Sequence, residues 1–176
     1  MSNYLTRMAR YNQWVNRRLY DKVQSLPATE IAKDRGAFFG SILGTLNHIL
    51  VGDIFWLRRF SSSKLCRDAL APMREMAMPT SLRDVLFDDI QILRVKREEM
   101  DTLILNFSET WNNEVLASPI RYRNIAGEKH QQPLGVLLQH LFNHQTHHRG
   151  QITTLLFQAG IDPESTDLIM MLMEED

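Results

Sequence analysis

Three of the six histidines of this chain lie in the stretch NHQTHHRGQ, residues 143–151. On an α-helix, residues four positions apart sit one turn above each other, so His144 and His148 can direct their rings to one point. His140 lies one turn before His144, and His147 lies three positions after it, so either could also pair with His144. Helical pairs of this kind supply part of many metal sites, because neutral imidazole binds zinc and nickel. The spacing alone does not choose among the three pairs.

A further imidazole would have to come from another helix, and His48 is the candidate. It lies within SILGTLNHILVGDIFWLRRF, residues 41–60, where apolar side chains surround nearly the whole helical circumference. A buried imidazole needs a partner, and a metal ion shared with the later histidines would provide one. Gly44 and Gly52, one turn to either side, would leave space beside the ring. Three histidines from two facing helices would leave a fourth coordination position open, as in catalytic zinc sites.

Several of these residues also have a simpler interpretation. His48 could be a hydrogen-bonded core histidine without any metal. Asp53 could accept a hydrogen bond from a ligating histidine or form an ion pair with Arg149. Arg149 and Gln151 are further candidates for contacts behind the ligands, and Cys66, in a predicted loop, is at most a fourth ligand. No carboxylate can be assigned as a general base, so the catalytic residues stay unknown.

Four long helices are predicted to position these side chains. Apolar residues recur at spacings of three and four in four segments, namely residues 3–26, 41–60, 82–107 and 134–160. Pro27 ends the first segment, and Gly160 suits the C-cap of the last. Ser81 and Asp84 resemble a capping box at the start of the third segment. We therefore expect an all-α fold in a single domain, residues 1–176.

The connections between these segments differ in character. Residues 61–80 contain two prolines and a serine run, which indicates a long crossover between the second and third helices. Residues 119–133 alternate apolar and polar side chains around a turn at 126–128, which predicts a short hairpin-like excursion. His130 lies on this excursion and is expected to be exposed. The tail behind Pro163 predicts a short final helix.

The composition narrows the class of protein. Hydrophobic residues make up 44% of the 176 residues and charged residues 23%, as in ordinary globular proteins. Lys and Arg number 20 against 21 Asp and Glu, so no basic field exists to hold nucleic acid or an anionic membrane. One cysteine excludes an internal disulfide, and neither a signal peptide nor a membrane span is apparent. We expect a cytoplasmic protein with a small-molecule partner and no nucleic-acid or membrane partner.

Three segments together resemble the DinB/YfiT-like family of metal-dependent enzymes, which is unrelated to the DNA polymerase of the same name. They are YNQWVNRRLYDKV at 11–23, LNHILVGDIFWLRRF at 46–60 and LQHLFNHQTHHRGQI at 138–152. The motif N-H-x-x-x-H-R-G-Q at 143–151 is the most specific part. The resemblance implies a four-helix bundle of up-down-down-up topology, often a homodimer. It also implies a divalent metal, usually nickel or zinc, held by His48, His144 and His148.

The resemblance implies more than one activity. Some relatives are thiol-dependent S-transferases or isomerases, in which the metal would bind the sulfur of a low-molecular-weight thiol and stabilise a thiolate. The leading hypothesis is therefore transfer of a thiol to a small electrophile. Alternatives are metal-dependent hydrolysis of small amides or esters, and a non-catalytic metal-binding bundle linked to stress. An interaction module is supported only by the methionine-rich stretches APMREMAMP and DLIMMLMEED.

Overall fold

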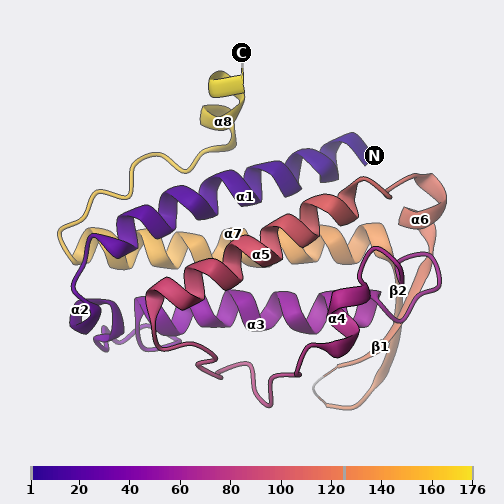
Figure 1. The fold of residues 1–176 in the computed structure, drawn as a ribbon, viewed down its shortest axis with the longest axis horizontal. Helices are drawn as coiled ribbons and strands as arrows, with labels where there is room; N and C mark the ends of the chain where they lie inside the picture. The colour runs from indigo at the N-terminus through magenta and orange to yellow at the C-terminus, as the bar shows by residue number, and fades with distance from the viewer. Residues whose placement is uncertain (1, 125, 176) are drawn as a thin grey trace.

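The computed structural model describes residues 2–124 and 126–175. Three predicted positions lie outside the described residues: the domain limits, 1 and 176, and Ile125 of the excursion. The described chain is mostly helical with one small two-stranded sheet. Figure 1 shows its four long helices lying side by side: α1 (Ser2–Gln24), α3 (Ile42–Phe60), α5 (Ile90–Ser108) and α7 (Leu134–Gln158). The prediction of a predominantly helical chain is confirmed.

Each long helix packs against two others. α1 packs on α5 and α7, and α3 packs on α7 and α5, which closes a common apolar core. Large side chains such as Phe60, Phe107 and Phe142 are almost completely buried in this core. α3 is buried on most of its surface, as its nearly continuous apolar circumference predicts.

The predicted excursion before the last long helix is a β-hairpin. Strand β1 (Pro119–Arg123) pairs antiparallel with β2 (Lys129–Pro133), in a register that places Tyr122 opposite His130. Gly127 lies in the turn with φ +82°, a conformation that glycine adopts without strain. Ile120 is buried against the core, whereas His130 is exposed, as predicted. A short helix that the sequence pattern missed, α6 (Asn113–Ala117), precedes the hairpin.

The third long helix begins later than predicted. α5 starts at Ile90, where Asp89 is the N-cap and accepts a hydrogen bond from the backbone N–H of Gln91. Asp84 instead closes a local turn by accepting from the N–H of Thr80 at 2.7 Å and of Ser81 at 3.1 Å. The crossover between α3 and α5 therefore spans residues 61–89 and contains only the short helix α4 (Ala71–Glu75).

A tertiary contact explains why the segment before Ile90 is not helical. The side chain of Asn47, buried in α3, donates to the Phe87 carbonyl at 2.9 Å and accepts from the Phe87 N–H at 3.0 Å. This pair satisfies the two backbone groups that a helix would otherwise have paired. Leu86 and Phe87 of this segment still pack against the apolar core, whereas Val85 is exposed.

The remaining ends follow the sequence signals closely. α1 ends at Gln24, two residues before Leu26, and Pro27 precedes the short helix α2 (Ala28–Ala32). Gly160, with φ +81°, follows the C-cap of α7. The predicted tail helix is α8 (Leu168–Glu175), next to α1 in Figure 1. Its Met171 packs against Tyr11 and Val15 of α1.

Replacement of Asn47 by alanine should destabilise the protein by about 2–3 kcal/mol, because both backbone groups of Phe87 would lose their buried partner. Thermal unfolding followed by circular dichroism measures the loss. Asn106→Ala, at an exposed position of α5, should change stability by less than about 0.5 kcal/mol. Equal effects of the two substitutions would show that the crossover does not depend on the Asn47 pair.

Candidate metal centre

Three histidines from two helices converge between α3 and α7. His48 Nε2 lies 3.1 Å from His144 Nε2 and 3.1 Å from His148 Nε2. The three potential ligand atoms all lie within 4.8 Å of one another. Of the pairs that the spacing allowed on α7, the structure brings His144 and His148 to His48.

Two of the rings are oriented by acceptors on their far side. His48 Nδ1 lies 2.8 Å from the Leu82 carbonyl, and His148 Nδ1 lies 2.8 Å from Gln151 Oε1. Because each of these oxygens can only accept, Nδ1 carries the proton and the Nε2 lone pair faces the other histidines. Carboxylate, carbonyl or amide acceptors of this kind orient metal-binding histidines in many proteins. The expected contact between Gln151 and a histidine is present.

His144 fits only because its neighbour on α3 has no side chain. A Cβ at Gly52 would lie 2.9 Å from His144 Cε1, closer than real Cβ atoms approach. Gly44 has a different purpose, since a Cβ there would meet the backbone carbonyl oxygen of Phe39 at 2.1 Å. This close approach allows the Phe39 ring to stack on His48, with ring centroids 3.7 Å apart.

Burial favours the neutral form of all three imidazoles. It lowers the pKa of His144 to about 3, with further lowering from His148 and His48. The pKa values of His48 and His148 are also lowered by burial, although hydrogen bonds to Leu82 and Gln151 oppose this. Neutral imidazole is the form that coordinates a metal ion.

The geometry and the donor set fit a divalent metal ion. Two nitrogens bound to one zinc ion at the usual distance of about 2.0–2.1 Å are separated by about 3.3 Å, close to the observed 3.1 Å. Without a cation or a proton between them, converging nitrogen lone pairs would repel one another. His144 Nδ1 is buried and has no hydrogen-bond partner in the described part of the chain. The three histidines could therefore bind a divalent metal ion through their Nε2 atoms.

The other two histidines of α7 lie outside this cluster. His147 is exposed, and its Nε2 lies 3.3 Å from the Gln151 amide nitrogen. His140 is exposed one turn before His144, and its ring meets the edge of Trp56 at 5.0 Å between centroids. Cys66 is fully buried in the apolar core and does not join the cluster, so the suggestion of a fourth ligand there is wrong.

Asp53 and Arg149 face the space between the long helices instead of the histidines. Asp53 forms a buried ion pair with Arg97 of α5 and accepts a hydrogen bond from Gln145 Nε2 at 2.7 Å. Arg149 donates to Asn12 of α1 and, at 3.2 Å, to Gln145 Oε1. The expectation that Asp53 contacts a ligating histidine or pairs with Arg149 is therefore wrong. The rotation of α3 and α7 places both residues on the interior face of the helices. There the two carboxylate oxygens of Asp53 are bound by Arg97 and Gln145.

These contacts belong to a larger central polar network to which all four long helices contribute: Asn12, Asn16, Asp53, Arg97, Asp101, Gln145 and Arg149. Within it, Asp101 accepts hydrogen bonds from Asn12 and Asn16 and lies 3.0 Å from Arg97 Nη2. Burial raises the pKa of Asp101 to about 6, although Arg97 and Asn16 oppose the increase. The desolvation cost of this carboxylate therefore exceeds the stabilisation by its partners.

Sequence reasoning missed Phe39 and five residues of the central polar network, namely Asn12, Asn16, Arg97, Asp101 and Gln145. Arg97 stands between Leu93 and Met100 in the apolar stripe of α5, and a charge at such a position was the available signal. Phe39 gave no signal, because its place over His48 depends on how the loop before α3 folds back.

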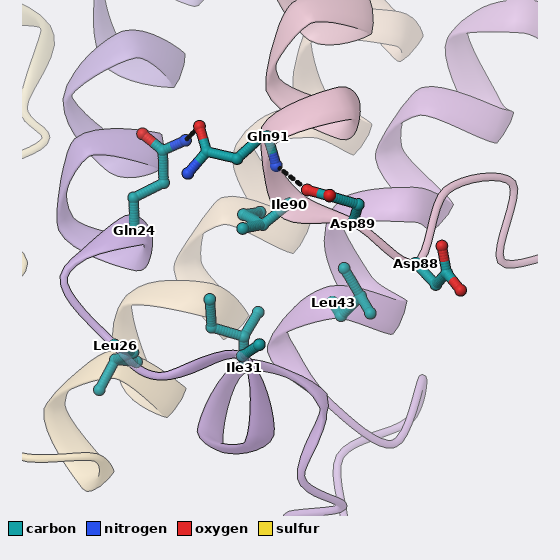
Figure 2. Close-up of a pocket in the computed structure, with 9 residues that line it drawn as sticks. Gln24, Leu26, Ile31, Leu43, Asp88, Asp89, Ile90 and Gln91 are labelled. Carbon is teal, nitrogen blue, oxygen red and sulfur yellow. Dashed lines mark hydrogen bonds between the residues drawn. The ribbon is translucent and has the colours of Figure 1, made fainter.

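A concave site elsewhere in the molecule has no such donor set. A cavity of about 600 Å³ lies where the end of α1, α2 and the starts of α3 and α5 meet. Figure 2 shows residues that line it. Gln24 donates to Gln91 at 2.7 Å across its wall, and the other polar lining residues include Asp88 and Asp89. None of the residues that line it is a histidine, so this cavity is separate from the candidate metal centre.

Comparison with known proteins places the chain in one family. The model of the DinB family matches residues 1–176, and the chain belongs to that family. Within residues 2–124 and 126–175, none of the helices is long and apolar enough to cross a membrane.

The relatives include two proteins of Bacillus subtilis (strain 168). The chain is 30% identical to "Protein DinB" over 172 residues, which cover 95% of this chain and 92% of the relative. It is 33% identical to "Uncharacterized protein YrdA" over 91 residues, which cover 52% of this chain and 47% of that protein. The crystal structure of a DinB-like protein from Bacillus cereus ATCC 10987 matches with a TM-score of 0.57 at 19% identity, over 86% of this chain and 89% of that one. This structural likeness shows a shared fold.

Asp101→Asn should change how stability depends on pH. Because the pKa of folded Asp101, about 6, lies above its ordinary value of 3.8, the folded protein binds the additional proton between these values. The contribution of Asp101 to the free energy of unfolding is fully present below about pH 4 and is lost as the pH rises through about 6. The loss is on the order of 2–3 kcal/mol. The difference in melting temperature between parent and variant should therefore shift in favour of the variant over this range.

The matched control for this measurement is Asp68→Asn, which removes an exposed carboxylate. Its melting temperature should follow that of the parent more closely across the same range. Parallel pH curves for the parent and Asp101→Asn would contradict the raised pKa and show that Asp101 titrates at the same pH in the folded and the unfolded protein.

Proposed function

We propose that this protein is a divalent-metal-dependent enzyme whose ligands are His48, His144 and His148. The observation that carries the proposal is the convergence of three Nε2 atoms, with His48 Nε2 3.1 Å from each of the other two. Two of these rings have their protons held on the opposite nitrogen, by Leu82 and Gln151. The Nε2 lone pairs of His48 and His148 therefore face each other at 3.1 Å, an arrangement that is repulsive without a cation between them.

The reaction that we propose is transfer of a low-molecular-weight thiol to a small electrophile, with nickel or zinc as the metal. A divalent ion held by three neutral histidines acts as a Lewis acid and lowers the pKa of a thiol or water that reaches its open position. The protein contributes the fixed ring orientations and a wall formed by Phe39, which covers one face of His48. Metal-dependent hydrolysis of a small amide or ester is the second candidate, because the same ligand set also suits activation of water.

The finer architecture belongs to the same proposal. We propose that residues 1–176 form one domain in which the four long helices run up-down-down-up, and that two copies associate as a homodimer. Membership of the DinB family over the whole chain supports this arrangement. The further partner that we propose is a small-molecule substrate.

Elemental analysis of protein purified without a metal-affinity tag tests the ligand set. The parent should contain nearly stoichiometric nickel or zinc, and His48→Ala, His144→Ala and His148→Ala should each lose it, since three histidines are the minimum for a catalytic site of this type. His130→Ala, at an exposed position of the hairpin, should retain the metal content of the parent.

Two results would contradict the proposal. One is retention of metal by all three ligand variants, and the other is a parent that binds no metal after nickel, zinc and manganese are supplied. With a metal-loaded parent, turnover of electrophiles only when a thiol is added supports the transferase, whereas turnover of esters or amides without thiol supports the hydrolase.

Gly52→Ala should weaken metal binding while the fold is retained. The new Cβ would displace the His144 ring, and a displaced ligand should lower metal affinity by about 10–100-fold, as loss of supporting contacts does in other metal sites. Gly150→Ala is the matched control on α7, because a Cβ there meets no other atom within 4 Å. Metal titration with a competing chelator measures both, and equal affinities would show that His144 is not a ligand.

A further inference from the structure

A row of aromatic side chains extends from the three histidines along α3 and α7 towards the hairpin. The His140 ring lies 6.1 Å from that of His144, and Trp56 lies 5.0 Å from His140. Tyr122 of β1 lies 5.2 Å from Trp56. We call these residues, His140, Trp56 and Tyr122, the aromatic row.

Arg59 lies at the far end of this row, and its guanidinium is held in place by neighbouring rings. Its Cζ lies 4.6 Å from the Trp56 ring and 5.3 Å from the Tyr122 ring. One nitrogen, Nη2, donates to the backbone carbonyl of Arg123 at 3.0 Å. A guanidinium stacked in this way keeps several N–H groups in a fixed planar fork, which suits recognition of a carboxylate.

The charge of Arg59 is not balanced by an acidic side chain. Within residues 2–124 and 126–175, Arg59 forms no ion pair, and its contacts are the neighbouring aromatic rings and the Arg123 carbonyl. Half-burial lowers the pKa of Arg59, and its positive charge in turn contributes to lowering that of His140. A half-buried, unpaired cation is energetically costly, and an anionic ligand would offset that cost.

The hairpin that Arg59 contacts carries further cations, together with one carboxylate, Glu128, whose Oε2 lies 3.7 Å from His130 Nε2. A cavity of about 720 Å³ adjoins the hairpin, and its lining consists of Arg121, Tyr122, Arg123, Lys129, His130 and Gln131. No acidic side chain is among these lining residues. Tyr122 therefore belongs both to the aromatic row and to a cavity that is rich in cations.

The helix geometry sets the distance between the two ends of the row. His48 and Arg59 are separated by about 16 Å along α3. Long side chains on a helix lean towards its N-terminus, and the contact with Trp56 shows that Arg59 does so. The guanidinium and the histidine cluster are therefore separated by on the order of 10 Å.

We propose that Arg59 binds a carboxylate of the small-molecule thiol whose sulfur reaches the three histidines. The ligand would be an anionic thiol that lies along the aromatic row, with the sulfur and the carboxylate at opposite ends. This inference rests on the proposed function, because it takes the histidine cluster as the position of the sulfur. Arg59 is then a binding residue that selects anionic thiols over neutral ones.

Mercaptoalkanoates of increasing length, from mercaptoacetate to mercaptooctanoate, are suitable probes, with the uncharged mercaptoalkanol of each length for comparison. Their binding to the nickel-loaded parent can be followed by the absorbance change and by calorimetry, without any assay of activity. The parent should bind one intermediate-length acid at least about tenfold more tightly than its alcohol, as expected for a charge-assisted contact. Arg59→Gln should lose this preference and leave binding of the alcohol unchanged.

Two further variants separate binding from structural and long-range effects. Arg59→Lys keeps the charge without the planar fork and should retain part of the preference. Arg121→Gln removes a cation of the hairpin cavity, where Arg121 contacts Gln131, and should retain most of it. Metal content and melting temperature of each variant show whether the histidine cluster and the fold are intact.

The outcomes distinguish this inference from the proposed function. If the parent binds metal and thiols but does not prefer acids, or if Arg59→Gln and Arg59→Lys both keep the full preference, the role of Arg59 is wrong and the metal enzyme stands. If the parent binds no metal, both proposals fail together. Loss of the preference in Arg59→Gln, with metal content unchanged, supports the anionic thiol.

Discussion

The buried ion pair between Arg97 and Asp53 is the contact on which the rest of the arrangement depends. Asp53 on α3 receives Arg97 from α5 and Gln145 from α7, so one carboxylate joins three helices. Gly52 directly precedes Asp53 in the chain, and His144 directly precedes Gln145. A rotation that turns Asp53 and Gln145 inwards therefore also turns Gly52 and His144 to an adjoining face, where they meet.

Because its charges are buried, the central polar network adds little to the free energy of unfolding. Its main effect is to favour one set of helix rotations over others. Two aspartates and two arginines take part in the central polar network, and the raised pKa of Asp101 shows that its desolvation is not fully offset. Breaking such a pair leaves an uncompensated charge and costs about 3–5 kcal/mol, although replacing the whole pair by apolar residues is often neutral. We interpret the network as a device that excludes other helix rotations and so fixes the positions of the histidines.

The crossover and the loop before α3 supply the contacts that hold the His48 ring in place. The Leu82 carbonyl orients His48, and Asn47 holds the same segment through Phe87. Phe39, in the loop before α3, stacks on the His48 ring. Metal-binding histidines usually donate their second ring N–H to an acceptor, and for His48 that acceptor is a backbone carbonyl of an irregular segment.

The sequence by itself determined the features that depend on local periodicity. Apolar spacing predicted the long helices, alternation predicted the hairpin, and the interval of four residues made His144 and His148 a possible pair, because these patterns follow from the geometry of one helix or strand. Only the tertiary structure decided that His48 meets both of them, that Asp53 pairs with Arg97, and that α5 begins at Ile90. Those outcomes depend on contacts between residues far apart in the chain, such as Asn47 with Phe87, and on helix rotations that no local pattern encodes.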